Sequence, residues 1–167
     1  TTKPTGIPRT ELAERRERLL EHLRSERLSG YVLFDEKYVQ YFTSFGFLAT
    51  ERPVAFASTA AGDLAVFVPE FEVERVRAET EFERVESYPE YPGTEHPMRI
   101  LSRVLDDLGI GGRIGADQDG YPGILGYQGP ALSTVMNASV TSLAAPIEHM
   151  VAQPTATNYT DSGLVSG

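Results

Sequence analysis

The sequence contains no cysteine among its 167 residues. This absence excludes disulfide bonds, thiolate zinc sites and cysteine nucleophiles. The chain also lacks any apolar run close to the ~18 residues that a membrane-spanning helix needs. Its first residues, "TTKPTGIPRT", contain no signal-peptide core. We therefore expect a cytoplasmic protein.

Lysine is scarce, because Lys3 and Lys37 are the only two lysines and every other basic residue except histidine is arginine. The net charge is −9, which disfavours nucleic acid as a partner. The arginine-rich segment "ERRERLLEHLR" alternates with glutamates, as a solvated helix face does. An acidic, lysine-poor surface suits a halophilic protein in a high-salt cytoplasm, where screening removes self-repulsion. A biased coding composition would give the same preference for arginine.

Hydrophobic residues make up 41% of the chain, which indicates a globular domain with a sizeable core. Strands that alternate with helices predict an α/β fold with a mixed β-sheet flanked by helices. The predicted strands are 31–34, 53–58, 64–68, 84–88, 113–117 and 139–143, the second and third forming a hairpin. Helices are predicted from the N-cap Thr10 to a stop before Gly30, around 38–45, over 72–82, from Pro97 to Gly109 and over part of 124–136.

The ends of the chain are polar and aperiodic in comparison with its centre. We expect residues 1–9 to form a loose N-terminus and residues 151–167 to form a loose polar tail. The predicted domain is therefore 10–150.

The stretch "RIGADQDGYPGILGYQGP" raises the possibility of a calcium or phosphate loop. In an EF-hand loop that begins at Asp117, Pro122 and Gln128 would replace the essential glycine and bidentate glutamate. A P-loop would need Lys and Ser/Thr where Tyr121 and Pro122 stand. The stretch is better explained as an acidic turn in which Asp117 and Asp119 cap local backbone amides.

No catalytic or metal-binding constellation emerges from the remaining residues. His22, His96 and His149 are far apart and lack paired ligand spacing. Asp35 ends a predicted strand, as a phospho-accepting aspartate does, but Lys37 is too close in sequence to supply the lysine that this chemistry needs. We therefore predict no metal ligand and no catalytic residue in this chain.

Aromatic residues concentrate between Tyr31 and Phe47. Four of them share helical spacing, which favours a buried helix face: Tyr38, Tyr41, Phe42 and Phe45. One or two of these rings could instead form the wall of a ligand pocket.

Several stretches, taken in order, resemble one family. "ERRERLLEHLRSERLSGYVLFDEKYVQYFTSF" is similar to the opening of the Xaa-Pro peptidases, prolidases and creatinases. Residues 38–45 occupy that family's N-I-x-Y-L-T-G-F motif, with Ser44 in place of its usual glycine. "RPVAFAS", "GDLAVFVPEFEVERVR", "YPEYPGTEHPM" and the acidic turn continue the likeness, which covers roughly residues 9–150.

The resemblance implies a creatinase/prolidase N-terminal domain with a ribonuclease H-like motif. In the family, such a non-catalytic domain supports homodimerisation and shapes the active-site entrance of a metallopeptidase. The resemblance places the metals, two divalent ions (Mn, Co or Zn), in a C-terminal "pita-bread" domain that this chain lacks. The expected partners are that catalytic domain, a second subunit and, in an Xaa-Pro dipeptidase or aminopeptidase, a short proline-containing peptide. Neither nucleic acid nor a membrane is an expected partner.

Two other functions remain open from the sequence. The longer protein to which this domain is expected to belong could be a creatinase-like hydrolase that cleaves a C–N bond in a small non-peptide substrate. The chain could also be a free-standing binding or interaction module.

Arg52 is the main candidate for substrate contact. It precedes Pro53, which favours an extended backbone at the start of a strand. Creatinase-like proteins have an arginine at the matching place that points into a substrate site, and a guanidinium can bind a carboxylate through two parallel bonds. The structural alternative is a surface ion pair with Glu51. Tyr41 and Gln40, within the matched aromatic motif, are the further candidates.

Overall fold

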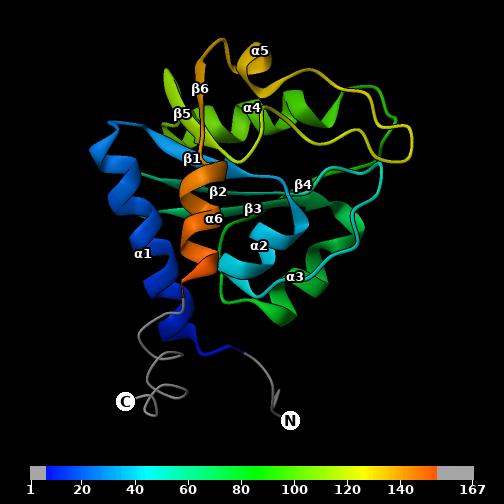
Figure 1. The fold of residues 1–167 in the computed structure, drawn as a ribbon. Helices are drawn as coiled ribbons and strands as arrows, with labels where there is room; N and C mark the ends of the chain where they lie inside the picture. Colours follow the sequence, from blue (N-terminus) through cyan, green and yellow to red (C-terminus); the bar gives the residue numbers. More distant parts are fainter. Residues whose placement is uncertain (1–6, 154–167) are drawn as a thin grey trace, which may run out of the picture.

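A computed structural model describes residues 7–153, and within them a six-stranded mixed sheet lies between two layers of helices (Figure 1). The central strand β1 (Gly30–Leu33) pairs antiparallel with β2 and parallel with β5. The sheet order is β4-β3-β2-β1-β5-β6. The other strands are β2 (Ala55–Thr59), β3 (Leu64–Pro69), β4 (Val85–Tyr88), β5 (Arg113–Ala116) and β6 (Ser139–Ser142). The predicted α/β fold with a mixed sheet is confirmed.

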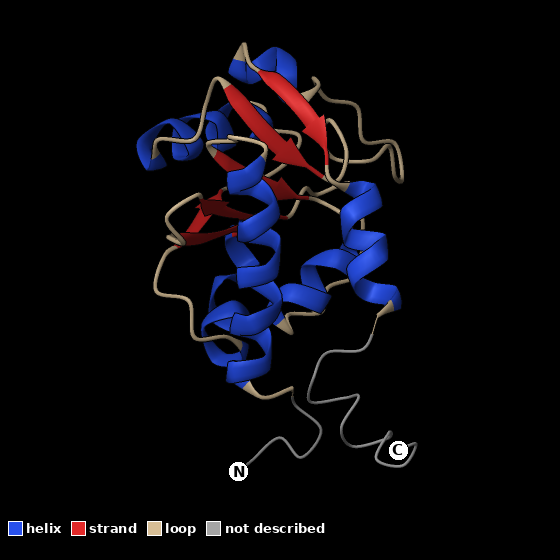
Figure 2. Ribbon diagram, turned by 60° about the vertical axis from the view of Figure 1, so that its left-hand side comes forward, coloured by secondary structure: helices blue, strands red, loops and turns tan. Residues whose placement is uncertain are grey.

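Helices cover both faces of the sheet, as Figures 1 and 2 show. One face carries α1 (Arg9–Ser25), α2 (Glu36–Thr43), α3 (Val73–Glu79, after a 3-10 turn over Glu70–Glu72) and α6 (Ala144–Ala152). The other face carries α4 (Pro97–Leu108) and α5 (Leu132–Met136).

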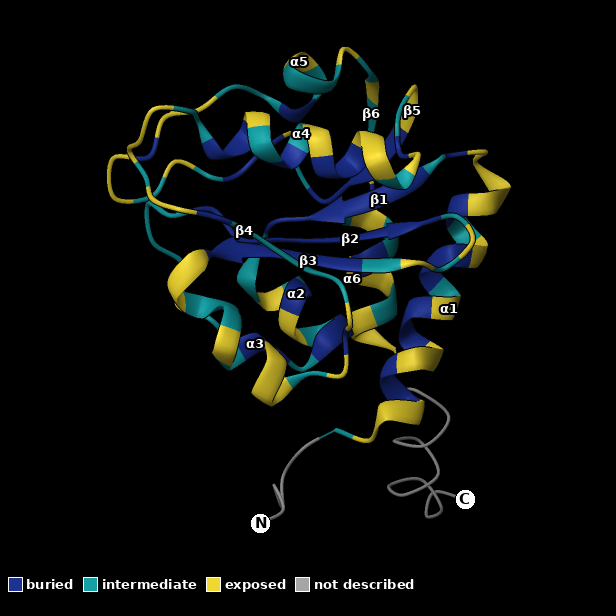
Figure 3. Cartoon of the chain, turned by 180° about the vertical axis from the view of Figure 1, so that it is seen from behind, coloured by how far each residue is buried: buried dark blue, intermediate teal, exposed yellow. Residues whose placement is uncertain are grey.

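The two layers of the core follow from the alternation of side chains along a strand. In β1, Tyr31 and Leu33 pack with α1 and α2, whereas Val32 packs with α4 on the other face. Both faces of this strand are therefore buried, which explains its continuous apolar sequence. Figure 3 shows the buried sheet enclosed by helices whose outer faces are exposed.

One edge of the sheet collects most of the connecting segments. Strand β2 is antiparallel to its neighbours, and the other five strands run in one common direction. The carboxyl ends of those five strands and the start of β2 therefore share one edge. In open α/β sheets, this edge is the one at which ligands bind.

The predicted limits of α4 and the predicted hairpin are confirmed. Helix α4 has Pro97 in its first turn, and Nδ1 of the N-cap His96 accepts a hydrogen bond from the Met98 amide at 3.0 Å. Gly109 ends this helix in the left-handed conformation, with φ of 84°. The predicted hairpin is also present as β2 and β3.

Both predicted ends of α1 were wrong. Thr10 lies inside the helix, and Pro8 takes the N-cap position without a side-chain cap. The helix ends at Ser25, well before Gly30, which begins β1. Glycine is needed there for a packing reason, because an added Cβ would lie 2.6 Å from the Ser58 carbonyl oxygen.

Three further segments differ from the sequence prediction. The helix expected within 124–136 is limited to α5, and α2 ends before Phe45, because Ser44 adopts the left-handed conformation. Helix α6 was not predicted and extends to Ala152, into the range 151–167. The remainder of that expected tail, and most of the expected loose N-terminus, lies outside the described residues.

Candidate functional site

Arg52 borders an open hollow of about 310 Å³ at the carboxyl edge of the sheet. It belongs to the α2–β2 loop, which we define as residues 44–54. Leu48 in this loop and Phe71 after β3 also line the hollow, and their exposed fractions are 83% and 69%. The hollow is also lined by Arg75 and by the carboxylates of Glu51 and Glu72. Arg75 is paired with Glu72 and Glu79, so Arg52 is the guanidinium that a small ligand with a carboxylate and an apolar group would meet beside the two exposed apolar side chains.

The ion pair between Arg52 and Glu51 is formed, with 3.1 Å between Nη1 and Oε2. Both side chains are about one-third exposed. A pair of this exposure stabilises a protein by about 0–1 kcal/mol. The Arg52 guanidinium carbon also lies 5.5 Å from the centroid of the Phe71 ring. Since Glu51 holds the guanidinium only weakly, a ligand carboxylate can compete for it.

The other two sequence-derived candidates lie on α2 and do not line this hollow. The Tyr41 ring packs beneath the Arg15 guanidinium, 4.0 Å from its centroid. Gln40 is exposed, and its side chain lies against Gly46, where an added Cβ would come within 3.3 Å of the amide nitrogen. The structure thus places Tyr41 in the contact between α1 and α2, and Gln40 beside the α2–β2 loop.

Phe71 and Leu48 are the potential ligand contacts that the sequence analysis did not identify. No local pattern marks them, because one follows a strand and the other lies in an aperiodic loop. Exposure of large apolar side chains is the informative signal, and it requires the folded structure.

Asp117 directly follows β5 and contacts the segment between β1 and α2. Its Oδ1 accepts a hydrogen bond from the Phe34 amide at 3.0 Å, and its Oδ2 accepts one from the Asp35 amide at 2.7 Å. These partners lie more than 80 residues away in the sequence, so the carboxylate does more than the local capping that was predicted, although the neighbouring Gln118 amide also interacts with it. Burial raises the pKa of Asp117 to about 6, and the Asp35, Phe34 and Gln118 amides partly oppose this shift.

Asp119 holds the start of α5. Its Oδ1 accepts a hydrogen bond from the Ser133 amide at 2.7 Å, and its Oδ2 accepts one from the Ser133 hydroxyl at 2.6 Å. These contacts also replace the local cap expected from the sequence. The two acidic side chains of the turn therefore hold separate backbone segments.

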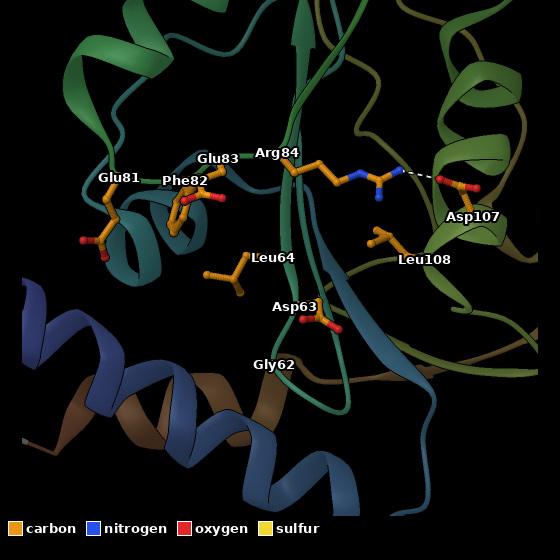
Figure 4. A pocket seen from close by; sticks show the side chains of 9 residues that line it. All are labelled: Gly62, Asp63, Leu64, Glu81, Phe82, Glu83, Arg84, Asp107 and Leu108. Atoms are coloured by element: carbon orange, nitrogen blue, oxygen red, sulfur yellow. Dashed lines mark hydrogen bonds and ion pairs between the residues drawn. The ribbon is translucent and has the colours of Figure 1, made fainter.

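A second hollow, of about 690 Å³, lies at the opposite edge of the sheet (Figure 4). Arg84 reaches across it to Asp107, with 2.7 Å between Nη2 and Oδ2. On the other side, Glu81 forms an ion pair with Arg9 at 2.9 Å. These carboxylates are engaged in pairs between elements, and we assign this hollow a structural role.

The described residues, 7–153, do not fit a metal centre. Within residues 7–153, no group of three or more His, Asp or Glu side chains is arranged to hold a metal ion. His96, for example, caps α4 and contacts the Gln128 carbonyl oxygen. In the same part of the chain, no helix is long and apolar enough to cross a membrane.

The fold and the site define a three-layer α/β domain with a ligand-sized hollow at the carboxyl edge of its sheet. Residues 15–150 match the family model described as the creatinase/prolidase N-terminal domain. The chain belongs to this family. No curated protein matches the sequence significantly.

Solved structures support the same assignment. A proline dipeptidase from Streptococcus pneumoniae is similar, with 27% identity, a TM-score of 0.67 and coverage of 83% of this chain and 97% of that chain. The prolidase from Pyrococcus horikoshii shares the fold at 16% identity and a TM-score of 0.63. Its alignment covers 88% of this chain but 37% of that chain. An Xaa-Pro dipeptidase from Bacillus anthracis also shares the fold, at 16% identity and a TM-score of 0.65. Its alignment covers 89% of this chain and 38% of that chain.

Proposed function

We propose that this chain is the non-catalytic N-terminal domain of a prolidase-like hydrolase that acts on Xaa-Pro peptides. In this proposal, the domain supports homodimerisation and shapes the entrance to an active site that a separate catalytic domain supplies. The similarity to a proline dipeptidase supports this function, as does coverage of less than two fifths of the longer dipeptidase and prolidase chains. The hollow beside Arg52 is the observation that carries the proposal.

The chemistry of the hollow suits the carboxyl end of a short peptide. The Arg52 guanidinium can bind a terminal carboxylate through two parallel charge-assisted bonds. Leu48 and Phe71 can contact an apolar proline ring beside that carboxylate. Tyr41 and Gln40 are proposed as further contacts at the side of the entrance. Divalent metal ions would activate water within the catalytic domain, because the described residues of this chain do not form a ligand set.

The first test compares this chain with a longer enzyme that also contains a catalytic domain. We expect this chain alone to hydrolyse no Xaa-Pro dipeptide when Mn²⁺, Co²⁺ or Zn²⁺ is added, and the longer enzyme to hydrolyse it. Creatine, assayed in parallel, identifies a creatinase-like parent. Turnover that scales with the concentration of this chain and survives further purification would contradict the proposal.

The second test replaces Arg52 with alanine in the longer enzyme. We expect kcat/KM for an Xaa-Pro dipeptide to fall about tenfold, equivalent to about 1.4 kcal/mol. The free energy of unfolding should change by no more than about 0.5 kcal/mol, since Arg52 is partly exposed. Arg77→Ala, on the exposed surface of α3, is the matched control. If Arg52→Ala leaves the kinetics unchanged, Arg52 does not contact the substrate and has only the structural role of its ion pair with Glu51.

A further inference from the structure

Two tyrosine hydroxyls hold the backbone on either side of Arg52. The Tyr121 hydroxyl donates a hydrogen bond to the Thr50 carbonyl oxygen at 2.8 Å. The Tyr88 hydroxyl donates one to the Pro53 carbonyl oxygen, also at 2.8 Å. Tyr88 ends β4, whereas Tyr121 belongs to the segment after β5. Both side chains lie in the core layer on the α4 face of the sheet, so two distant parts of the chain hold the loop from the same face.

We propose that Tyr88 and Tyr121 are positioning residues that hold Arg52 in place for binding the substrate carboxylate. This inference rests on the function proposed above. The two acceptor carbonyls bracket Glu51 and Arg52, the only charged residues of the α2–β2 loop. Fixing the backbone on both sides reduces the conformational freedom that binding would otherwise remove.

Other contacts support a held loop. The Ala49 amide donates a hydrogen bond to Glu36 Oε1 at 2.9 Å, which anchors the loop to the start of α2. The Arg52 amide donates one to the Thr50 hydroxyl at 3.2 Å. Backbone restraint therefore extends through the segment that presents the guanidinium, while its side chain stays about one-third exposed.

Both phenols remain donors at neutral pH. Burial raises the pKa of Tyr121 to about 12. Burial also raises the pKa of Tyr88. The two hydroxyl groups thus keep their protons throughout the pH range in which most hydrolases work.

Tyr127 offers a matched control from the same region. Its ring packs edge-on against Tyr121, with 5.1 Å between centroids. Its hydroxyl is buried and has no hydrogen-bond partner in the described part of the chain. Tyr127→Phe therefore removes a buried hydroxyl without removing a bond to the α2–β2 loop, whereas Tyr121→Phe and Tyr88→Phe each remove one.

The first measurement is amide hydrogen exchange in this chain. We expect Tyr121→Phe and Tyr88→Phe to speed exchange at residues 49–52 at least about threefold relative to the core strands, because a held backbone opens less often. Tyr127→Phe should leave this ratio unchanged. If Tyr121→Phe and Tyr88→Phe both show the wild-type rate of amide exchange at residues 49–52, with the fold verified by the melting temperature, the proposal is overturned.

The second measurement is steady-state hydrolysis of an Xaa-Pro dipeptide by the longer enzyme. Tyr121→Phe and Tyr88→Phe should each raise KM about threefold or more with little change in kcat. This result is expected when an interaction common to the ground and transition states is weakened. In the Arg52→Ala background, Tyr121→Phe should have no further effect on KM, because the group that it positions is gone.

The outcomes separate the two proposals. If Arg52→Ala leaves kinetics unchanged, the proposed function of Arg52 fails, and the positioning role fails with it. If Arg52→Ala raises KM but Tyr121→Phe and Tyr88→Phe both retain the wild-type KM, only the positioning role is overturned. An equal additional loss from Tyr121→Phe in the presence and absence of Arg52 would also overturn it, because the tyrosine would then act independently.

Discussion

At the scale of single residues, the Asp117 carboxylate joins the end of β5 to the segment between β1 and α2. A helix start with free amides is a natural anion site in α/β proteins. Here the anion is the chain's own carboxylate, which accepts hydrogen bonds from the Phe34 and Asp35 amides just before α2. The acidic turn that resembles a phosphate loop in sequence therefore uses its first carboxylate to join two parts of the chain.

The raised pKa of Asp117 predicts a pH-dependent stability. The folded pKa is about 6, whereas an unfolded aspartate has a pKa of about 3.9. The folded state therefore binds the proton more tightly. The stabilisation is fully present below about pH 4 and is lost as pH rises through about 6. We expect Asp117 to lower the free energy of unfolding by on the order of 2 kcal/mol across this range.

Denaturant titrations between pH 4 and 7 measure this contribution. Asp117→Asn should remove that component of the slope, whereas Asp106→Asn, on the exposed surface of α4, should retain the wild-type slope. An identical pH dependence in wild type and Asp117→Asn would show that the folded carboxyl group is not perturbed.

At the scale of elements, α1 completes the end of α2. The last carbonyl groups of a helix lack intrahelical partners. Arg15 Nη1 donates a hydrogen bond to the Tyr41 carbonyl oxygen at 2.7 Å, and Arg16 Nη1 donates one to that of Phe42 at 2.8 Å. Two guanidinium groups from one helix thus satisfy the end of another, where positive charge is also favoured by the helix dipole.

Arg16→Met should therefore destabilise the domain by about 1.5–3 kcal/mol, the usual range for a hydrogen bond to a charged group. Methionine keeps an apolar stem of similar length but leaves the Phe42 carbonyl oxygen without this donor. Urea unfolding measures the effect, and Arg77→Met on α3 is the exposed control. A loss for Arg16→Met no larger than for Arg77→Met would contradict the capping role.

The sequence was informative wherever a local rule determines the structure. Pro97 and Gly109 identified the limits of α4, and the hairpin turn identified β2 and β3. Alternation of strands with helices indicated a mixed α/β sheet, which the structure and the family match confirm.

Local rules failed where distant residues supply the partners. Helix α1 begins at Arg9 and ends at Ser25, so neither Thr10 nor Gly30 marks its limits. Helix α6 is held by burial of Ile147 in the core rather than by a strong sequence signal. For the same reason, the exposure of Phe71 and the bond from Tyr121 to Thr50 could not be predicted, because both depend on the arrangement of separate strands. Whether Arg52, Tyr41 and Gln40 contact substrate stays a prediction.

At the scale of the whole molecule, net charge is the property with a direct thermodynamic consequence. A charge of −9 destabilises the folded chain through self-repulsion, which salt screens. Most of the ion pairs are partly exposed and individually worth about 0–1 kcal/mol, so their loss at high salt has a small opposing effect.

We therefore expect the thermal midpoint to rise as potassium chloride increases from low to molar concentration. Circular dichroism melts measure this change, and an uncharged osmolyte at equal osmolality controls for solvent exclusion. The rise should be steepest below about 0.15 M, where the screening length changes most. A flat or falling midpoint would remove the basis for salt adaptation.

The central position of β1 also has a consequence for the order of folding. Its antiparallel partner β2 follows after one short helix. By contrast, the bond from Ser29 Oγ to the carbonyl oxygen of Arg113, the first residue of β5, joins residues 84 apart. Closing a loop of that length costs about 4 kcal/mol in chain entropy. We therefore expect β1, β2 and β3 to gain amide protection before β5 and β6 when refolding is followed by pulsed hydrogen exchange. Simultaneous protection of all these strands would contradict this order.

If the expected order holds, the parallel strands β5 and β6 assemble on a template that the antiparallel strands β1, β2 and β3 have already formed. Because β1 belongs to both pairings, damage to β1 would slow both stages of folding.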